Sequence, residues 1–148
     1  MRILGLDYGS KTIGVAVSDP LLITAFGLET IRRPEESAIK KSISRLGEII
    51  KEYEINKFVL GYPKHLDNTD SARCVKTLEF KERLSRNFKN IEIILWDERF
   101  SSVYAERELS GAGMDRSKIN GVVDKIAAVV ILQNYLESIN RNGVVNGQ

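Results

Sequence analysis

The chain has 148 residues, of which 43% are hydrophobic and 28% charged, a composition typical of one ordinary folded domain. Its apolar runs fall short of the ~20 residues that span a membrane, an acid at position 7 comes too early for a signal peptide, and its single cysteine excludes an internal disulfide. We therefore expect a cytoplasmic protein without a membrane partner, and the net charge of +2 neither requires nor excludes nucleic acid.

The first part of the chain predicts three strands joined by short turns. Residues 2–7 and 12–18 are apolar and flank a short turn, so they predict a hairpin. Asp19-Pro20 then turns the chain into a third extended segment over about 21–31. Because short turns join these strands, we expect them to be antiparallel.

After the third strand the sequence alternates between helices and strands. Apolar residues at spacings of four and three, from Ile39 to Tyr53, predict an amphipathic helix. Residues 57–61 and 91–96 predict two further strands, with a helix over about 71–88 between them. Helical crossovers of this kind join parallel strands. The order predicts an α/β fold, with a five-stranded mixed sheet of three antiparallel and then two parallel strands, flanked by helices.

Two helices and a tail are expected at the end of the chain. A short helix capped by Ser101 or Ser102 follows the fifth strand, and a long helix covers 117–138. The remaining residues, 140–148, alternate Asn and Gly around two valines and predict a flexible tail. We therefore expect one domain over residues 1–139.

Acidic residues fall where the expected strands end, which is where ligands usually bind on such sheets. Asp7 ends the first strand, and Asp97 and Glu98 follow the fifth. Each alone is also compatible with a turn or a polar strand exit. Because consecutive residues point to opposite sides, only one of Asp97 and Glu98 is expected to face a shared site.

Asp124 is the acid that is hardest to explain by structure alone. Its neighbours at helical spacing are Ala127, Ala128 and Ile131, so its face of the long helix is small and apolar. A buried carboxylate costs several kcal/mol unless it meets a cation or a hydrogen-bond network. Three acids from different elements at one edge suit Mg²⁺ or Mn²⁺, which prefer oxygen ligands and can activate water for phosphodiester cleavage.

Three motifs of the chain, in this order, closely resemble the bacterial YqgF/RuvX family. They are GLDYGSKTIGVAVSD from Gly5, WDERFS from Trp96 and VDKIAAVVILQ from Val123. Members of this family are described as Holliday junction resolvases and as nucleases that mature the 5′ end of pre-16S ribosomal RNA.

The resemblance implies a ribonuclease H-like fold and a set of metal-binding catalytic acids. These acids are Asp7, Glu98 and Asp124, with Asp97 as a helper. Related junction resolvases carry an acid at the end of the fourth strand. This chain has Gly61-Tyr62-Pro63 there instead, so the pair after the fifth strand has to supply the second ligand.

Five further residues are candidates for substrate binding, each with a structural alternative. The turn around Lys11 and Thr12 nearly matches a P-loop but leads into a strand, so we reject a P-loop and keep a phosphate contact. Arg99 suits either a phosphate or a salt bridge. Ser101 suits a helix cap, and His65 suits a solvated loop residue or a proton-transfer group.

The leading hypothesis is a Mg²⁺- or Mn²⁺-dependent nuclease that acts on structured nucleic acid, with pre-16S rRNA as the expected substrate. The first alternative is a Holliday junction resolvase on branched DNA, which would work as a two-fold homodimer. A second is an actin-like ATPase, because Asp7, Gly9 and Gly14 resemble its phosphate loop; its two duplicated domains do not fit 148 residues. A third is a non-catalytic module that docks on ribosomal precursors or transcription machinery.

Overall fold

The computed structural model describes residues 1–62, 72–97 and 116–146, and within the last segment it describes the side chains of 125–140. The strands are β1 (Arg2–Tyr8), β2 (Thr12–Ser18), β3 (Ala25–Arg32), β4 (Ile55–Tyr62) and β5 (Glu92–Asp97). The helices are α1 (Lys40–Tyr53), α2 (Ala72–Asn87) and α4 (Arg116–Asn146). These elements occur in the expected order. None of these helices is both long enough and apolar enough to cross a membrane.

The strands form one mixed sheet in the order β3-β2-β1-β4-β5. β1 pairs antiparallel with β2, and β2 pairs antiparallel with β3. β4 lies parallel to both β1 and β5. The expected arrangement of three antiparallel strands followed by two parallel ones is therefore confirmed, and the topology switches at β1, in the middle of the sheet.

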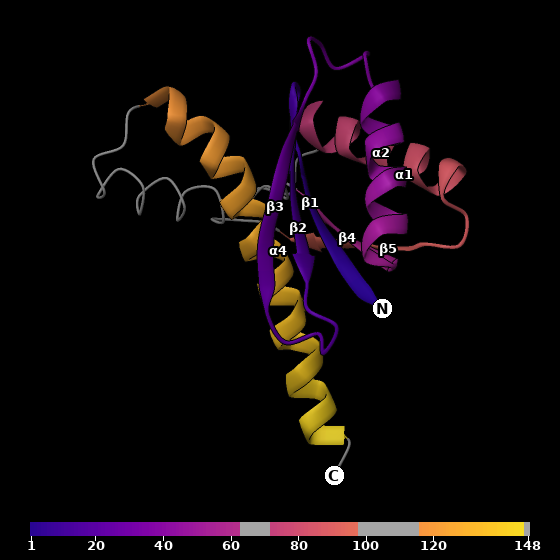
Figure 1. Ribbon diagram of the computed structural model, residues 1–148, viewed down its shortest axis with the longest axis vertical. Helices are drawn as coiled ribbons and strands as arrows, with labels where there is room; N and C mark the ends of the chain where they lie inside the picture. Colours follow the sequence, from indigo (N-terminus) through magenta and orange to yellow (C-terminus); the bar gives the residue numbers. More distant parts are fainter. Residues whose placement is uncertain (63–71, 98–115, 147–148) are drawn as a thin grey trace.

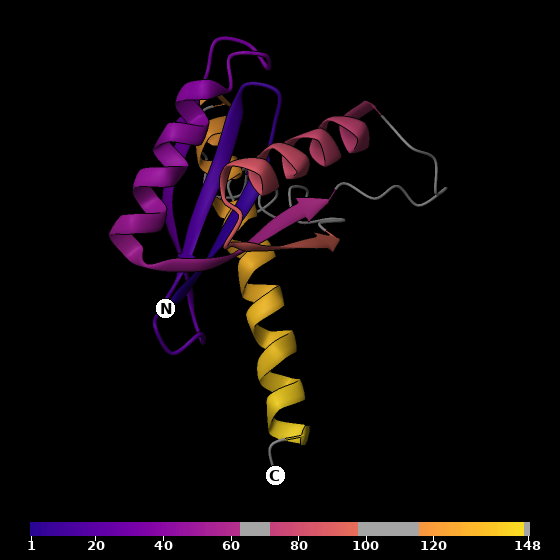
Figure 2. The same cartoon turned by 90° about the vertical axis from the view of Figure 1, so that its right-hand side faces the viewer.

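Helices cover both faces of the sheet, with α1 and α2 on one face and α4 on the other (Figures 1 and 2). Strand alternation explains the two layers. Leu4, Leu6 and Tyr8 of β1 belong to the core beneath α1 and α2, whereas Ile3 belongs to the core beneath α4. The two sides of β1 therefore build two separate cores.

A row of small residues lets α4 lie close to the sheet. Gly5, Ala16 and Gly27 are cross-strand partners on β1, β2 and β3. A Cβ atom built on Gly5 would lie 2.7 Å from the Cβ of Leu132 and 3.0 Å from the carbonyl oxygen of Ala128. The register between β1 and α4 is therefore fixed by contact with the helix backbone.

The third strand begins at Ala25, later than the expected position near residue 21. The carboxylate of Asp19 accepts hydrogen bonds from the backbone N–H groups of Ile23 (2.7 Å) and Thr24 (3.0 Å). These bonds hold the intervening residues in a loop, where Leu22 has a φ of 60°. The side chain of Asp19 competes here with strand pairing.

The long helix continues to Asn146, past the expected end at 138. The side-chain amide of Asn140 donates a hydrogen bond to the carbonyl of Leu22, 3.0 Å away. This bond anchors α4 to the β2–β3 loop at the point where fraying was expected. The helix therefore includes most of residues 140–148, which were expected to form a flexible tail. The expected boundary of the domain at residue 139 stays a prediction. The short helix expected after β5 lies outside the described residues.

Gly47→Ala is expected to stabilise the protein by about 0.5–1 kcal/mol, because Ala loses less conformational entropy than Gly in a helix. Gly47 lies within α1, and an added Cβ would meet the ring of Phe88 at 3.6 Å, an ordinary van der Waals distance. Urea denaturation of both proteins measures the difference. A lower midpoint for the variant would contradict this packing of α1 on Phe88.

Candidate active site

Asp7 lies near the carboxyl end of β1, in the middle of the sheet. It is the cross-strand partner of Gly14 on β2, and its side chain is half-buried. Strand alternation places it on the same face as Ile3 and Gly5, which is the face that α4 covers. Asp7 therefore lies where a residue from α4 can approach it.

The register between β1 and α4 predicts which residue that is. The two elements run in opposite directions (Figure 1), and Gly5 abuts Ala128 and Leu132. Asp7 lies two residues beyond Gly5, ~6.6 Å along the strand. One helical turn before Ala128, ~5.4 Å along α4, is position 124. Positions 7 and 124 are therefore expected to be neighbours.

Buried residues support this placement of position 124. Ala127, Ala128 and Ile131 are all fully buried against the sheet, and they lie three, four and seven positions after Asp124 in α4. Residues at these spacings share one helix face. The expectation of a small, apolar helix face is therefore confirmed for these three residues. The side chain of Asp124 itself lies outside the described part of the chain.

At the end of β5, strand alternation separates Asp97 from the face that α4 covers. Trp96 packs edge-on against Tyr135 of α4, with ring centroids 5.4 Å apart. Asp97 is the next residue, so it lies on the opposite face, and it is exposed. The alternation therefore argues against Asp97 as a partner of Asp7, and Glu98 lies outside the described residues.

Four of the predicted site residues lie outside the described residues. They are His65, Glu98, Arg99 and Ser101. Among the side chains that the structure does describe, no group of three His, Cys, Asp or Glu residues is placed to hold a metal ion. The predicted acid set includes Glu98 and Asp124, so its assembly around a metal stays a prediction.

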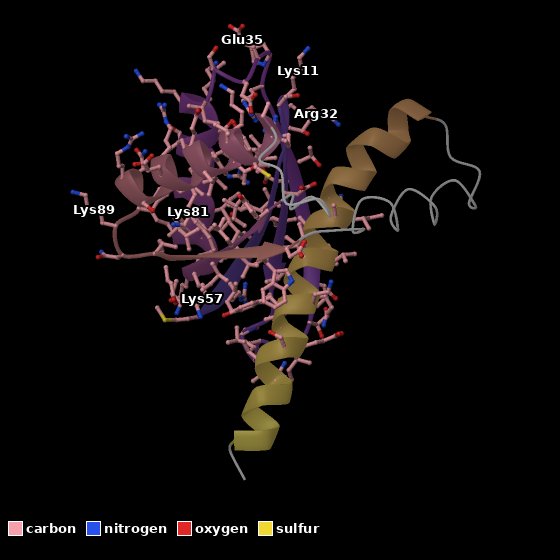
Figure 3. All side chains as sticks on the ribbon, turned by 180° about the vertical axis from the view of Figure 1, so that it is seen from behind. Lys11, Arg32, Glu35, Lys57, Lys81 and Lys89 are labelled. Carbon is pink, nitrogen blue, oxygen red and sulfur yellow. The ribbon has the colours of Figure 1, made fainter. Side chains whose placement is uncertain are left out.

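Lys11 and Thr12 lie at the same end of the sheet as Asp7. The Gly9 N–H donates to the carbonyl of Thr12 (2.7 Å) and closes the β1–β2 turn, on which Lys11 is exposed. Arg32 is the cross-strand partner of Thr12 and is also exposed. Figure 3 shows Lys11 and Arg32 together at this end. Arg32 reaches this end of the sheet through the β2–β3 register, which sequence reasoning did not predict.

A second group of polar residues, which sequence reasoning missed, lies on the other face of the same strand end. The ring of Tyr8 stacks on Phe80, with centroids 4.2 Å apart, and the guanidinium groups of Arg33 and Arg73 lie 4.9 and 5.1 Å from the centre of the Tyr8 ring. Glu36 accepts a hydrogen bond from Arg73 at 2.8 Å and lies 3.9 Å from Arg33. We call Tyr8, Arg33, Glu36 and Arg73 the Tyr8 cluster.

The Tyr8 cluster shifts the pKa values of two of its members in opposite directions. Burial, followed by its hydrogen bond with Glu36, raises the pKa of Tyr8. Burial alone would raise the pKa of Glu36, but hydrogen bonds from Arg73 and Tyr8 and the charges of both arginines hold it below the usual 4.5. Tyr8 therefore stays neutral and Glu36 ionised at neutral pH. No periodic sequence pattern marks this cluster, because it joins a strand, a loop and a helix.

Glu36→Gln is expected to lower stability at neutral pH by roughly 1 kcal/mol, because it removes a charged acceptor from a partly exposed network. A lowered folded-state pKa contributes stability that is present above the unfolded value of 4.5 and is lost as the pH falls through the folded value. The difference between wild type and variant should therefore shrink as the pH falls below about 4.5. Urea midpoints at a series of pH values measure it, and a difference that is constant with pH would contradict the pKa direction.

A cavity of about 400 Å³ lies on the side of the sheet that α2 covers. Tyr8, Glu36 and Phe80 line it. The lining also includes charged residues of α2, which are Lys76, Glu79, Glu82, Arg83 and Arg86. Acidic and basic side chains balance in this lining, so its charge favours no particular class of ligand. Asp7 lies on the opposite face of the sheet, which α4 covers.

Comparisons with known proteins identify relatives of this chain. The RuvX family model, described as "Holliday junction resolvase", matches residues 1–138. A relative from Agathobacter rectalis is 49% identical over 142 residues, which are 96% of this chain and 99% of the relative. One from Desulfitobacterium hafniense is 45% identical over 148 residues, 100% of this chain and 98% of the relative. Both carry the name "Putative pre-16S rRNA nuclease".

Two solved structures share the fold at low sequence identity. RuvC of T. thermophilus, in complex with a Holliday junction substrate, aligns with a TM-score of 0.54 at 13% identity, over 93% of this chain and 94% of that one. The fowlpox virus Holliday junction resolvase aligns with a TM-score of 0.52 at 17% identity, over 94% and 99%. The expected ribonuclease H-like fold is confirmed, and so is the expectation of a nuclease.

Proposed function

Because the chain belongs to the RuvX family, we propose that it is a divalent-metal-dependent nuclease that processes the 5′ end of pre-16S rRNA in the cytoplasm. The observation that carries the proposal is the position of Asp7. It lies half-buried at the carboxyl end of the central strand, on the face where α4 contacts the sheet one helical turn from position 124. Two acids at this junction favour a bound cation, since adjacent carboxylates otherwise repel each other.

The donor chemistry fits Mg²⁺ or Mn²⁺. We assign Asp7, Glu98 and Asp124 as the ligands, all carboxylates, which both ions prefer. Asp97 is left out, because Trp96 packs against α4 and so places Asp97 on the other face. When bound, such an ion supplies Lewis acidity and lowers the pKa of water.

The remaining residues of the site bind and orient the substrate in this proposal. The ammonium group of Lys11 and the hydroxyl group of Thr12 contact a backbone phosphate, and Arg99 contacts a second one as a two-pronged donor. Ser101 and His65 complete the substrate contacts. Water attacks the phosphorus in line, the bond to the 3′ oxygen breaks, and the products carry a 5′-phosphate and a 3′-hydroxyl.

The test is a cleavage assay on two substrates, a precursor of 16S rRNA with its 5′ extension and a four-way DNA junction. With Mg²⁺ present, we expect the purified protein to shorten the RNA to a defined 5′ end and to leave the junction largely intact. Chelation of the metal should stop the reaction. Wild-type protein that cleaved neither substrate with Mg²⁺ or Mn²⁺ would overturn the proposal.

A resolvase is the second candidate, and the fold shared with RuvC and the fowlpox enzyme favours it. A resolvase acts on a two-fold symmetric substrate, so it is expected to work as a homodimer. Symmetric nicking of the junction in the same assay, together with a dimer in sedimentation, would favour this candidate over RNA processing.

A further inference from the structure

We propose that Arg33 is a positioning residue of the active site, which holds the β1–β2 turn so that Asp7, Lys11 and Thr12 keep their places. The proposal rests on the metal-dependent nuclease function proposed above. Arg33 follows the end of β3, and nothing in its sequence setting distinguishes it from the neighbouring surface bases. In the fold, its side chain is only 2% exposed.

Arg33 contacts the turn at two points. Its backbone N–H donates to the carbonyl of Lys11, 2.9 Å away, and its Nη2 donates to the carbonyl of Gly9, 2.6 Å away. Between these contacts, the Gly9 N–H bonds to the carbonyl of Thr12 at 2.7 Å. Arg33 therefore bridges both sides of a turn that begins two residues after Asp7.

The Tyr8 cluster fixes the guanidinium group itself. Tyr8 lies beneath it at 4.9 Å, and the Glu36 carboxylate lies 3.9 Å from Nη2. Within the described residues, Nε and Nη1 of Arg33 are buried without a hydrogen-bond acceptor. Burying unpaired donors is unfavourable. Among the described residues, the guanidinium therefore makes its direct hydrogen bond to the Gly9 carbonyl in the turn.

The opposite faces of β1 explain how the cluster acts on the site. The ring of Tyr8 is held by contacts with Phe80 and with the guanidinium groups of the two arginines. Asp7 precedes Tyr8 directly and points to the α4 face. Fixing Tyr8 and Gly9 therefore restricts the backbone from which the Asp7 carboxylate projects. Groups that orient a metal ligand contribute to metal affinity, and Arg33 acts one step further away, through the backbone of the turn.

The experiment measures Mn²⁺ affinity by calorimetry, together with the Mg²⁺ concentration that gives half-maximal cleavage. Arg33→Met should weaken Mn²⁺ binding by about tenfold, the lower end of the effect of losing a group that orients a metal ligand, and raise the half-maximal Mg²⁺ concentration by a similar factor. Arg33→Lys keeps a cationic donor that can reach the Gly9 carbonyl and should restore most of the affinity. Irreversibly unfolded protein lowers the fitted stoichiometry and leaves the dissociation constant unchanged, whereas reversible unfolding raises the apparent dissociation constant and is measured with a control variant.

Arg45→Met is the matched control. Arg45 makes a two-pronged salt bridge to Glu29, with distances of 2.6 and 3.0 Å, on α1 and away from the turn. Its loss should reduce stability and leave Mn²⁺ affinity unchanged. Should Arg33→Met fail to fold, Arg33→Gln replaces it with a smaller neutral side chain, and the same weakening is expected.

The outcomes separate this proposal from the function on which it rests. Wild-type protein that binds no Mn²⁺ would overturn the proposed function together with the role of Arg33. Wild type and Arg33 variants that bind Mn²⁺ equally well would overturn the positioning role alone. Equal weakening in the Arg33 and Arg45 variants would also overturn it, because the effect would then be general destabilisation.

Discussion

Asp7→Asn is expected to lower the cleavage rate by on the order of 10³-fold or more, because losing a metal-ligating carboxylate removes several kcal/mol of transition-state stabilisation. The substitution keeps the size of the side chain and removes its charge. Its site is half-buried at a strand end, so the fold should tolerate the change. Single-turnover cleavage of the RNA precursor at saturating Mg²⁺ measures the effect.

Asp19→Asn is the matched control for this experiment. Asp19 follows the far end of β2 and accepts backbone hydrogen bonds in the β2–β3 loop, at the opposite edge of the sheet from Asp7. The Asp19→Asn variant should cleave the RNA precursor at the wild-type rate. An Asp7→Asn protein that cleaved within a few-fold of wild type would remove Asp7 from the active site.

Gly5→Ala is expected to destabilise the protein by about 2 kcal/mol and to reduce cleavage as well. The added Cβ would lie 2.7 Å from the Cβ of Leu132 and 3.0 Å from the carbonyl oxygen of Ala128. Both atoms belong to or adjoin the helix backbone, so α4 must move away from β1. That movement displaces position 124 from Asp7. Thermal denaturation and the cleavage rate of the folded variant measure the two effects.

Gly27→Ala makes the same chemical change in the same row of small residues and serves as the control. Its Cβ would meet the Cγ of Lys125 at 2.9 Å, and this flexible side chain can turn aside. The variant should lose less stability than Gly5→Ala and keep its cleavage rate. Equal losses in both variants would contradict a rigid contact between β1 and α4 at Gly5.

Sequence periodicity was sufficient to predict the sheet. Short turns after residues 7 and 18 required antiparallel neighbours, and the two strands that follow helices required parallel ones. The same rules placed Asp7 at the end of the first strand, and the structure shows that this strand is the central one. They also identified Asp124 as a charge on an apolar helix face, and the burial of Ala127, Ala128 and Ile131 confirms that face.

Periodicity could not predict features that depend on single side chains. The Asp19 carboxylate delays β3 by capping two backbone amides, and Asn140 anchors α4 where a tail was expected. The Tyr8 cluster joins β1, the loop after β3 and α2, so no one segment carries its signal. Burial of Arg33 contradicts the usual exposure of arginine and emerges only from the assembled fold.

In the proposed active site, Asp7 and Asp124 share one metal ion with Glu98. A crystal structure of the protein soaked with Mn²⁺, with the metal located by anomalous scattering, tests this directly. We expect a peak within coordination distance of the carboxylates of Asp7 and Asp124, with Glu98 as a further ligand. A structure in which Mn²⁺ bound elsewhere, or in which the Asp124 carboxylate lay far from Asp7, would contradict it.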